Sequence, residues 1–166
     1  MKREYTRIDT IRELVDGMLR QLGDETLKRD GSFHLYGTGM LATMLALKRG
    51  PDVTYAEAAN VAGILHDFTK YRDYEKKNKS TEDHAHLCEP VAREILQQSG
   101  CFSKEETDAI CLAIYHHSDK ANVHGEMEEI LKDADSLQHW LRNPTEDRGK
   151  VHENARVARL RQELGF

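Results

Sequence analysis

The sequence predicts an all-α protein, a compact bundle of six or seven helices, and three observations support this fold class. Apolar residues recur at spacings of three and four along most of the chain, which is the period of one helix face. No stretch alternates β-branched and polar residues as a half-buried strand would. No internal repeat or low-complexity tract interrupts the helical pattern.

The apolar period divides the chain into candidate helices separated by turn or capping signals. They are expected over residues 8–22, 33–48, 55–66, 83–98, 103–117, 126–141 and 147–164. Gly23 and Gly50-Pro51 follow the first two, as helix-ending residues do. The T-x-x-E and S-x-x-E boxes that begin at Thr54 and Ser103 predict the starts of the third and fifth helices. The charged segment 70–83 has no period, so a loop is expected there.

Length, charge and cysteine content predict a single cytoplasmic domain. A chain of 166 residues is of ordinary single-domain size. The net charge of -5 disfavours nucleic acid and anionic membranes as partners. The three cysteines have no C-x-x-C spacing and fit a reducing compartment. No apolar run approaches the roughly 18–20 residues of a membrane span, and the first residues lack the apolar core of a signal peptide. The oligomeric state is left open.

Histidine and aspartate residues gather at helix ends or on helices that the core needs. The groups are His34, His66-Asp67, His84 with His86, His116-His117, and Asp133 with Asp135. Imidazole and carboxylate groups are common ligands of divalent Fe, Mn, Co, Ni and Zn. Helical bundles build dinuclear sites from such side chains on facing helices. The clustering therefore predicts a metal site inside the bundle.

Each histidine taken alone supports this hypothesis only weakly. A single helical histidine is more often a surface residue or a hydrogen-bonded core residue, and ligand status has a prior of roughly one in five. His124 and His152 have polar neighbours and are expected to be solvated; His139 is expected at the surface or against the helix of Trp140. Asp67 is more informative because it follows an alanine-rich apolar helix. A carboxylate buried there would need a cation or strong donors.

The order His34, His66-Asp67 and Asp135 resembles the H…HD…D pattern of the HD-domain superfamily of metal-dependent phosphohydrolases. The stretch "ANVAGILHDFTK" is similar to the HD-bearing helix of that family, including Lys70 three residues after the aspartate. The resemblance covers about residues 30–142. It implies an HD-like core there, within one domain over 1–166, with the N- and C-terminal helices packing on it.

The resemblance also implies a ligand set for one or two divalent ions (Fe, Mn, Co, Ni, Mg or Zn). His34, His66, Asp67 and Asp135 match the family's pattern. Asp135 is preferred over Asp133 because the apolar Leu131, Ala134 and Leu137 predict that it is nearer the inner side of its helix.

Two further histidine ligands occur in the dinuclear branches of the family, and His86 and His116 match them by spacing. His84 and His86 cannot point the same way along a helix; His86 is preferred for its spacing, and the choice between the two stays open. In the His116-His117 pair, His116 is preferred because it follows the apolar Leu112 and Ala113, and this choice also stays open.

The activity implied by the resemblance is hydrolysis of a small phosphate ester or anhydride, expected to be a nucleotide, by metal-activated water. Metal coordination lowers the pKa of bound water to about 7 and neutralises phosphoryl oxygens. Asp67 and Lys70 are the expected catalytic residues, and Lys70, Arg72 and His117 are expected to bind substrate. Two alternatives remain: a degenerate HD domain that binds metal or nucleotide without turnover, and a purely structural helical protein.

Overall fold

The computed structural model describes residues 5–75, 84–145 and 150–165 of the chain. These residues form eight helices and no β-strand, so the predicted all-α fold class is confirmed. The helices are α1 (Arg7–Gln21), α2 (Glu25–Arg49), α3 (Val53–Leu65), α4 (Phe68–Glu75), α5 (His84–Ser99), α6 (Lys104–His116), α7 (Glu126–Arg142) and α8 (Val151–Leu164).

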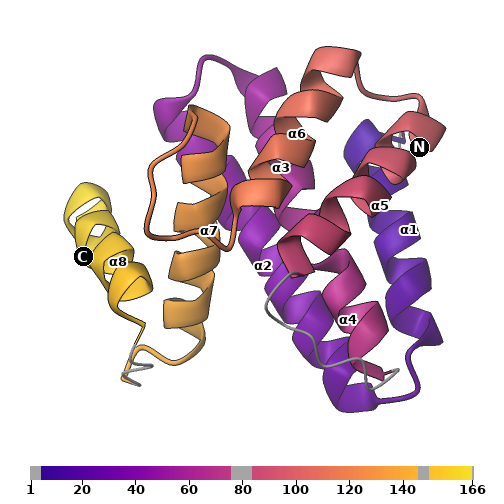
Figure 1. Cartoon of the computed structure of the whole chain (residues 1–166), viewed down its shortest axis with the longest axis horizontal. Helices are drawn as coiled ribbons and strands as arrows, with labels where there is room; N and C mark the ends of the chain where they lie inside the picture. Colours follow the sequence, from indigo (N-terminus) through magenta and orange to yellow (C-terminus); the bar gives the residue numbers. More distant parts are fainter. Residues whose placement is uncertain (1–4, 76–83, 146–149, 166) are drawn as a thin grey trace.

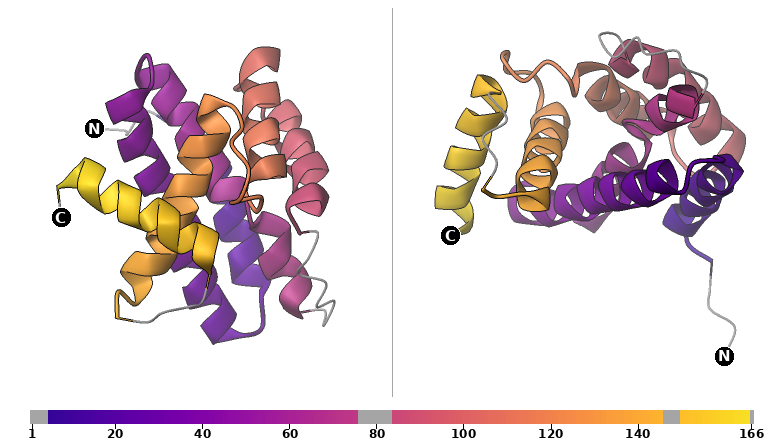
Figure 2. Two further views of the ribbon diagram at one scale, coloured as in Figure 1. Left: turned by 60° about the vertical axis from the view of Figure 1, so that its left-hand side comes forward. Right: turned by 90° about the horizontal axis from the view of Figure 1, so that it is seen from below.

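The long helix α2 and the apolar helix α3 form the centre of the bundle. They pack along each other more extensively than any other pair, and α7 packs on α2. Helix α6 contacts α3, α5 and α7, while α1 and α4 lie on the α5 side. Helix α8 packs on α7 at the far edge of the bundle, as Figures 1 and 2 show. The shared centre therefore consists of α2, α3 and α7.

Two hydrophobic clusters fix these central helices from both sides. The larger joins α1, α3, α5 and α6 to Leu35 of α2 and Leu131 of α7. The smaller joins the second half of α2 and the start of α3 to α7 and to Leu160 of α8. A fully buried leucine contributes about 1.5–3 kcal/mol. Because α2, α3 and α7 belong to both clusters, side chains on their inner faces have well-defined positions.

Two glycines allow α2 and α3 to approach at backbone distance. A Cβ on Gly63 would lie 2.6 Å from Cα and 2.7 Å from the backbone nitrogen of Gly39. Real Cβ atoms do not come so close to backbone. The small-residue composition of α3 is therefore a requirement of this helix pair, and it brings His34 of α2 close to His66, which follows α3.

Several predicted boundaries are corrected. Helix α2 begins eight residues earlier than expected, because Asp24 caps the amide groups of Thr26 and Leu27. The predicted Thr54 box is wrong: Asp52 accepts a hydrogen bond from the Tyr55 amide and caps α3. The Ser103 box is confirmed.

Helix α4 was not predicted, since the charged segment 70–83 was expected to be a loop. Residues 70–75 belong to α4, and residues 76–83 lie outside the described part of the chain. Phe68 and Tyr71 of α4 are buried against the larger cluster. Two apolar contacts at a spacing of three are enough to dock a helix this short, but too few to give a period in the sequence.

A buried carboxylate holds α8 against the bundle. Asp133 on α7 is fully buried and pairs with Arg49 of α2 and with Arg156 and Arg159 of α8, at 2.7–2.9 Å. An unpaired carboxylate would be costly to bury, and the arginines around Asp133 offset this cost with charged hydrogen bonds. Asp133 thus faces α8, whereas Asp135, two residues on, faces the other way.

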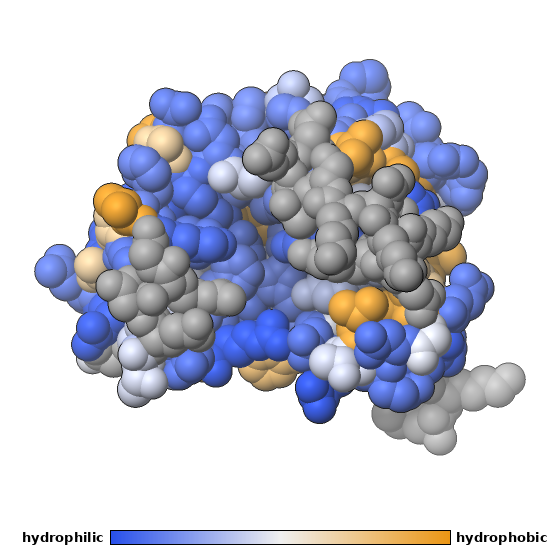
Figure 3. Space-filling view, turned by 60° about the horizontal axis from the view of Figure 1, so that its bottom comes forward, coloured by the Kyte–Doolittle hydropathy of each residue, from blue (hydrophilic) through white to orange (hydrophobic). Residues whose placement is uncertain are grey.

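The face seen in Figure 3 is mainly hydrophilic, and apolar groups appear on it as small separate patches. None of the helices in the described part of the chain combines the length and the apolar character needed to cross a lipid bilayer.

Candidate metal centre

The four residues of the H…HD…D pattern converge inside the bundle. His34 and His66 are buried, and their Nε2 atoms lie 3.0 Å apart. Oδ2 of Asp67 lies 3.3 Å from Nε2 of His34 and 3.7 Å from that of His66. Oδ1 of Asp135 lies 3.5 and 3.6 Å from the same two nitrogen atoms. Two imidazoles and two carboxylates from α2, α7 and the α3–α4 junction therefore face one point.

The other nitrogen of each ring is fixed by a hydrogen bond. Nδ1 of His66 donates to the Gly63 carbonyl at 2.7 Å. Nδ1 of His34 lies 2.7 Å from Oε1 of Gln138, whose amide nitrogen donates to the Phe33 carbonyl, so the ring nitrogen is the donor. With Nδ1 protonated, a neutral ring turns the Nε2 lone pair toward the carboxylates, which is the tautomer that metal-binding histidines use.

A second group of donors gathers on the other oxygen of Asp67. Oδ1 of Asp67 lies 3.2 Å from Nε2 of His84 and 3.4 Å from Nε2 of His117. These two nitrogens are 3.1 Å apart. Nδ1 of His117 donates to the Ile114 carbonyl at 2.7 Å, so its Nε2 also presents a lone pair. Each oxygen of Asp67 therefore faces its own pair of histidines.

The choice of His86 and His116 as the additional ligands is corrected, because both lie outside this centre. His86 is exposed and stacks on Tyr115 at 4.1 Å between ring centroids. His116 stacks on His124 at 3.9 Å.

Helix rotation explains both corrections. His117 follows the buried Ala113 and Ile114 by four and three residues, whereas His116 follows Leu112, which is 48% exposed. His84 precedes the buried Cys88 by one turn and so shares its face of α5. His117, expected to contact substrate, is thus part of the candidate metal centre itself.

The donor set fits a divalent cation. Two ligands bonded to one ion at about 2.1 Å and separated by 90–120° lie about 3.0–3.6 Å apart, and the distances within each group fall in or close to this range. Oδ1 of Asp67 and Oδ1 of Asp135 are buried and accept no well-formed hydrogen bond from the described residues, although imidazole nitrogens are near. Groups that could bind a metal are His34–His66–Asp135 and His66–Asp67–His117.

Burial and mutual charge set the protonation of these groups. Burial lowers the pKa of His66, and it lowers that of His117 to about 4, so both rings are neutral at neutral pH. Burial alone would raise the pKa of Asp67 and Asp135, but the surrounding histidines and lysines outweigh it, and both pKa values lie well below the usual range. Burial alone would lower the pKa of His34, but the carboxylates of Asp67 and Asp135 outweigh it and raise this pKa. The centre thus offers two carboxylates and the neutral imidazoles of His66 and His117, the protonation states that bind metals.

Two lysines contact the carboxylates of the centre. Nζ of Lys70 lies 2.6 Å from Oδ2 of Asp67, and Nζ of Lys120 lies 2.6 Å from Oδ2 of Asp135. Sequence reasoning missed Lys120, which belongs to the α6–α7 loop where no period exists. One signal was available: Lys120 follows His117 by three residues, as Lys70 follows Asp67. Arg72 lies two residues beyond Lys70 on α4, and its contact with substrate stays a prediction.

His139 was also missed. Its ring stacks on that of His34, with centroids 5.0 Å apart and planes at 8°. Nε2 lies 3.6 Å from Oδ1 of Asp135, and Nδ1 lies 3.4 Å from a carboxylate oxygen of Glu153. Its spacing of four from Asp135 puts both on one face of α7. The expectation of a surface position, or of packing on the helix of Trp140, is corrected.

The fold and this centre define the class of protein: a helical bundle whose buried histidines and aspartates form candidate sites for divalent metal. The chain belongs to the HD domain family, whose model matches residues 32–140. No curated protein and no solved structure shows a significant match to the chain. Helices α1 and α8 lie outside the matched residues.

Proposed function

We propose that this protein is a metal-dependent phosphohydrolase that acts on a small phosphate ester or anhydride, with a nucleotide as the expected substrate. The observation that carries the proposal is the position of Asp67, whose two oxygens face the His34–His66 pair and the His84–His117 pair separately. A carboxylate between two sets of imidazoles suits a ligand shared by two ions.

The proposed ligands are His34, His66, Asp67 and Asp135 for one ion, and Asp67, His84 and His117 for the other. When bound, such ions lower the pKa of water to about 7 and neutralise phosphoryl oxygens. The second set has only three protein donors, which leaves room for water or substrate, as catalytic sites require.

The remaining charged residues have roles that follow from position. Lys70 lies 2.6 Å from Oδ2 of Asp67, the oxygen that also faces His34, and Lys120 lies 2.6 Å from Oδ2 of Asp135. From there an ammonium group can contact a phosphate oxygen and stabilise the charge that grows on it. The backbone carbonyls and Gln138 orient the rings and act as positioning groups.

The test is a substrate screen of the purified protein with Mn²⁺, Fe²⁺, Co²⁺, Ni²⁺, Mg²⁺ and Zn²⁺ in turn. Phosphomonoesters, phosphodiesters, and nucleoside mono-, di- and triphosphates form the panel. The expected result is release of phosphate or pyrophosphate, or of a monoester and an alcohol from a diester, in a reaction that needs metal and stops with a chelator. Metal binding without turnover on any of these compounds would contradict hydrolysis and favour a binding module.

A further inference from the structure

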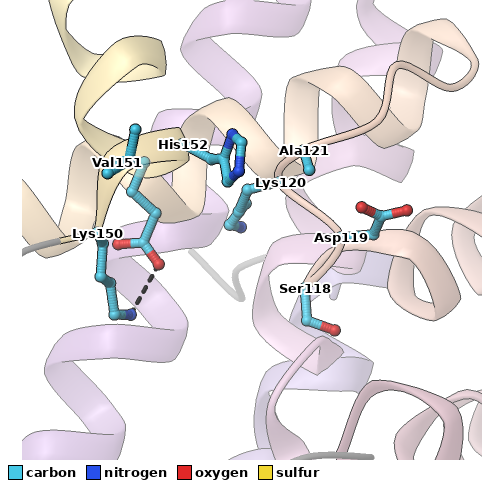
Figure 4. Close-up of a pocket in the computed structure, with 8 residues that line it drawn as sticks. Ser118, Asp119, Lys120, Ala121, Lys150, Val151 and His152 are labelled. Atoms are coloured by element: carbon cyan, nitrogen blue, oxygen red, sulfur yellow. Dashed lines mark hydrogen bonds and ion pairs between the residues drawn. The ribbon is translucent and has the colours of Figure 1, made fainter.

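A pocket of about 340 Å³ lies beside the metal centre, between the α6–α7 loop and the first turn of α8. The walls are formed by Ser118, Asp119, Lys120, Ala121, Lys150, Val151, His152 and Glu153. Figure 4 shows that they come from two segments, 118–121 and 150–153, which face each other. We propose that this pocket receives the nucleoside part of a nucleotide whose phosphate lies at the metal centre. The inference rests on the proposed function and assigns the group that the substrate carries.

Two residues belong both to the pocket and to the contacts of the centre. Lys120 lines the pocket, and its Nζ lies 2.6 Å from Oδ2 of Asp135. Glu153 lines the pocket from the other wall and contacts His139, which in turn lies 3.6 Å from Oδ1 of Asp135. A phosphate at the centre and a group in the pocket are therefore separated by no more than one side chain.

The walls of the pocket are fixed relative to each other. Arg156 of α8 donates from Nε to the Lys120 carbonyl at 3.1 Å and from Nη1 to Glu129 and Asp133 on α7. Its side chain is only 7% exposed. The first turn of α8 is thus held against the loop by a buried guanidinium, and this preorganises the pocket.

The charges in the lining favour an uncharged polar ligand. Lys120 is paired with Asp135, and Lys150 is paired with Glu153 at 2.7 Å, the dashed contact in Figure 4. Asp119 accepts hydrogen bonds from Asn122. Two lysines and two acidic residues in the walls cancel in net charge. A further polyphosphate would therefore gain little here, whereas a sugar and a base can use these donors and acceptors.

The volume of the pocket and the side chains that line it suit a nucleoside. Ligand pockets start at about 300 Å³, so a volume near 340 Å³ suits a small group such as a nucleoside. Val151 and the ring of His152 add flat or apolar surface beside the polar groups. Because α8 lies outside residues 32–140, this half of the pocket belongs to the chain's own C-terminal segment and not to the matched family core.

The experiment compares a substitution that fills the pocket with a matched substitution outside it. Ala121→Trp puts a large ring into the pocket, and Val123→Trp puts the same ring on the same loop at a residue that is 82% exposed and does not line it. Both proteins are loaded with Mn²⁺, and metal content is measured. Hydrolysis of the best nucleoside monophosphate is compared with hydrolysis of p-nitrophenyl phosphate. We expect kcat/KM for the nucleotide, relative to p-nitrophenyl phosphate, to fall at least tenfold in Ala121→Trp and to stay unchanged in Val123→Trp.

A second measurement does not depend on turnover. Adenosine, guanosine, cytidine and uridine monophosphates are added to ¹⁵N-labelled protein loaded with Zn²⁺, and amide shifts are followed. Shifts at 118–121 and 150–153 that disappear in Ala121→Trp support the pocket. Equal selectivity ratios in the two variants, or shifts confined to other segments, overturn it. If no substrate is hydrolysed at all, the proposed function fails, and the amide shifts alone decide the pocket.

Discussion

Nε2 of His34 and Nε2 of His66 face each other at 3.0 Å while the opposite nitrogen of each ring is bound to an acceptor. Two neutral imidazoles in this arrangement would point lone pairs at one another. A proton or a cation between them removes the repulsion. The packing of α2 on α3 has therefore fixed a geometry that a metal ion satisfies, with Asp67 and Asp135 supplying negative charge on either side.

Asp67→Asn should greatly reduce activity while the protein still folds. The amide keeps the shape of the carboxylate but loses the charge that both histidine pairs face. Losing one strong transition-state interaction costs about 3–4 kcal/mol, or roughly 10²–10³ in rate. We expect at least a hundredfold lower turnover, with reduced metal content, in a protein that is still helical by circular dichroism. Near-normal turnover per molecule would contradict the central role of Asp67.

His84→Ala and His86→Ala form a matched pair that tests the second metal position. Nε2 of His84 lies 3.2 Å from Asp67, whereas His86 stacks on Tyr115 outside the centre. We expect His84→Ala to lose about one metal ion per chain at saturation, and His86→Ala to bind as much as the unmodified protein. Elemental analysis after dialysis gives the ratio. Unchanged metal content in His84→Ala would indicate that His84 is not a ligand.

Gly63→Ala should destabilise the fold, because its Cβ would meet the backbone of Gly39 at 2.6 Å. Overpacking costs about 1–3 kcal/mol, and we expect the upper end since neither helix backbone can move aside. Gly17→Ala is the control: nothing lies within 4 Å of its added Cβ, and alanine in a helix interior should stabilise by about 0.5–1 kcal/mol. Urea unfolding of both variants measures the difference. Equal midpoints would show that the close approach of α2 and α3 is not needed.

Glu129 should make stability depend on acid pH. Burial raises its pKa, but hydrogen bonds from Arg156 and Lys132 outweigh this and bring it to about 2. Because the folded pKa lies below the usual 4.5, the stabilisation is complete above pH 4.5 and is lost as the pH falls toward 2. Glu129→Gln should be less stable at pH 7 and should lose less stability between pH 4.5 and 2. Denaturant unfolding across this range tests it, with the exposed Glu13→Gln as control.

Chain-wide periodicity determined the all-α class, and it identified every described helix except α4. The period of apolar residues is visible in the sequence because each long helix buries one face. The doublet His66-Asp67 after an apolar helix, with His34 and Asp135 on neighbouring helices, likewise contained enough information to predict which side chains would meet, since the core requires those helices to pack together.

The tertiary structure alone decided which histidine of each candidate pair faces inward and which residues lie beside the centre. Helical residues one and two positions apart point about 100° and 200° apart, so the rotation of α6 places His117 rather than His116 at the centre, and that of α5 places His84 rather than His86 there. That rotation is set by contacts with other helices. These contacts cannot be read from the order of residues along the chain. Lys120 lies in a loop without period. Glu153 contacts His139 beside the centre because Arg156 and Arg159 hold α8 on Asp133. The four residues of the H…HD…D pattern follow from the order of the chain, whereas long-range packing places the His84–His117 pair, Lys120 beside Asp135 and the pocket.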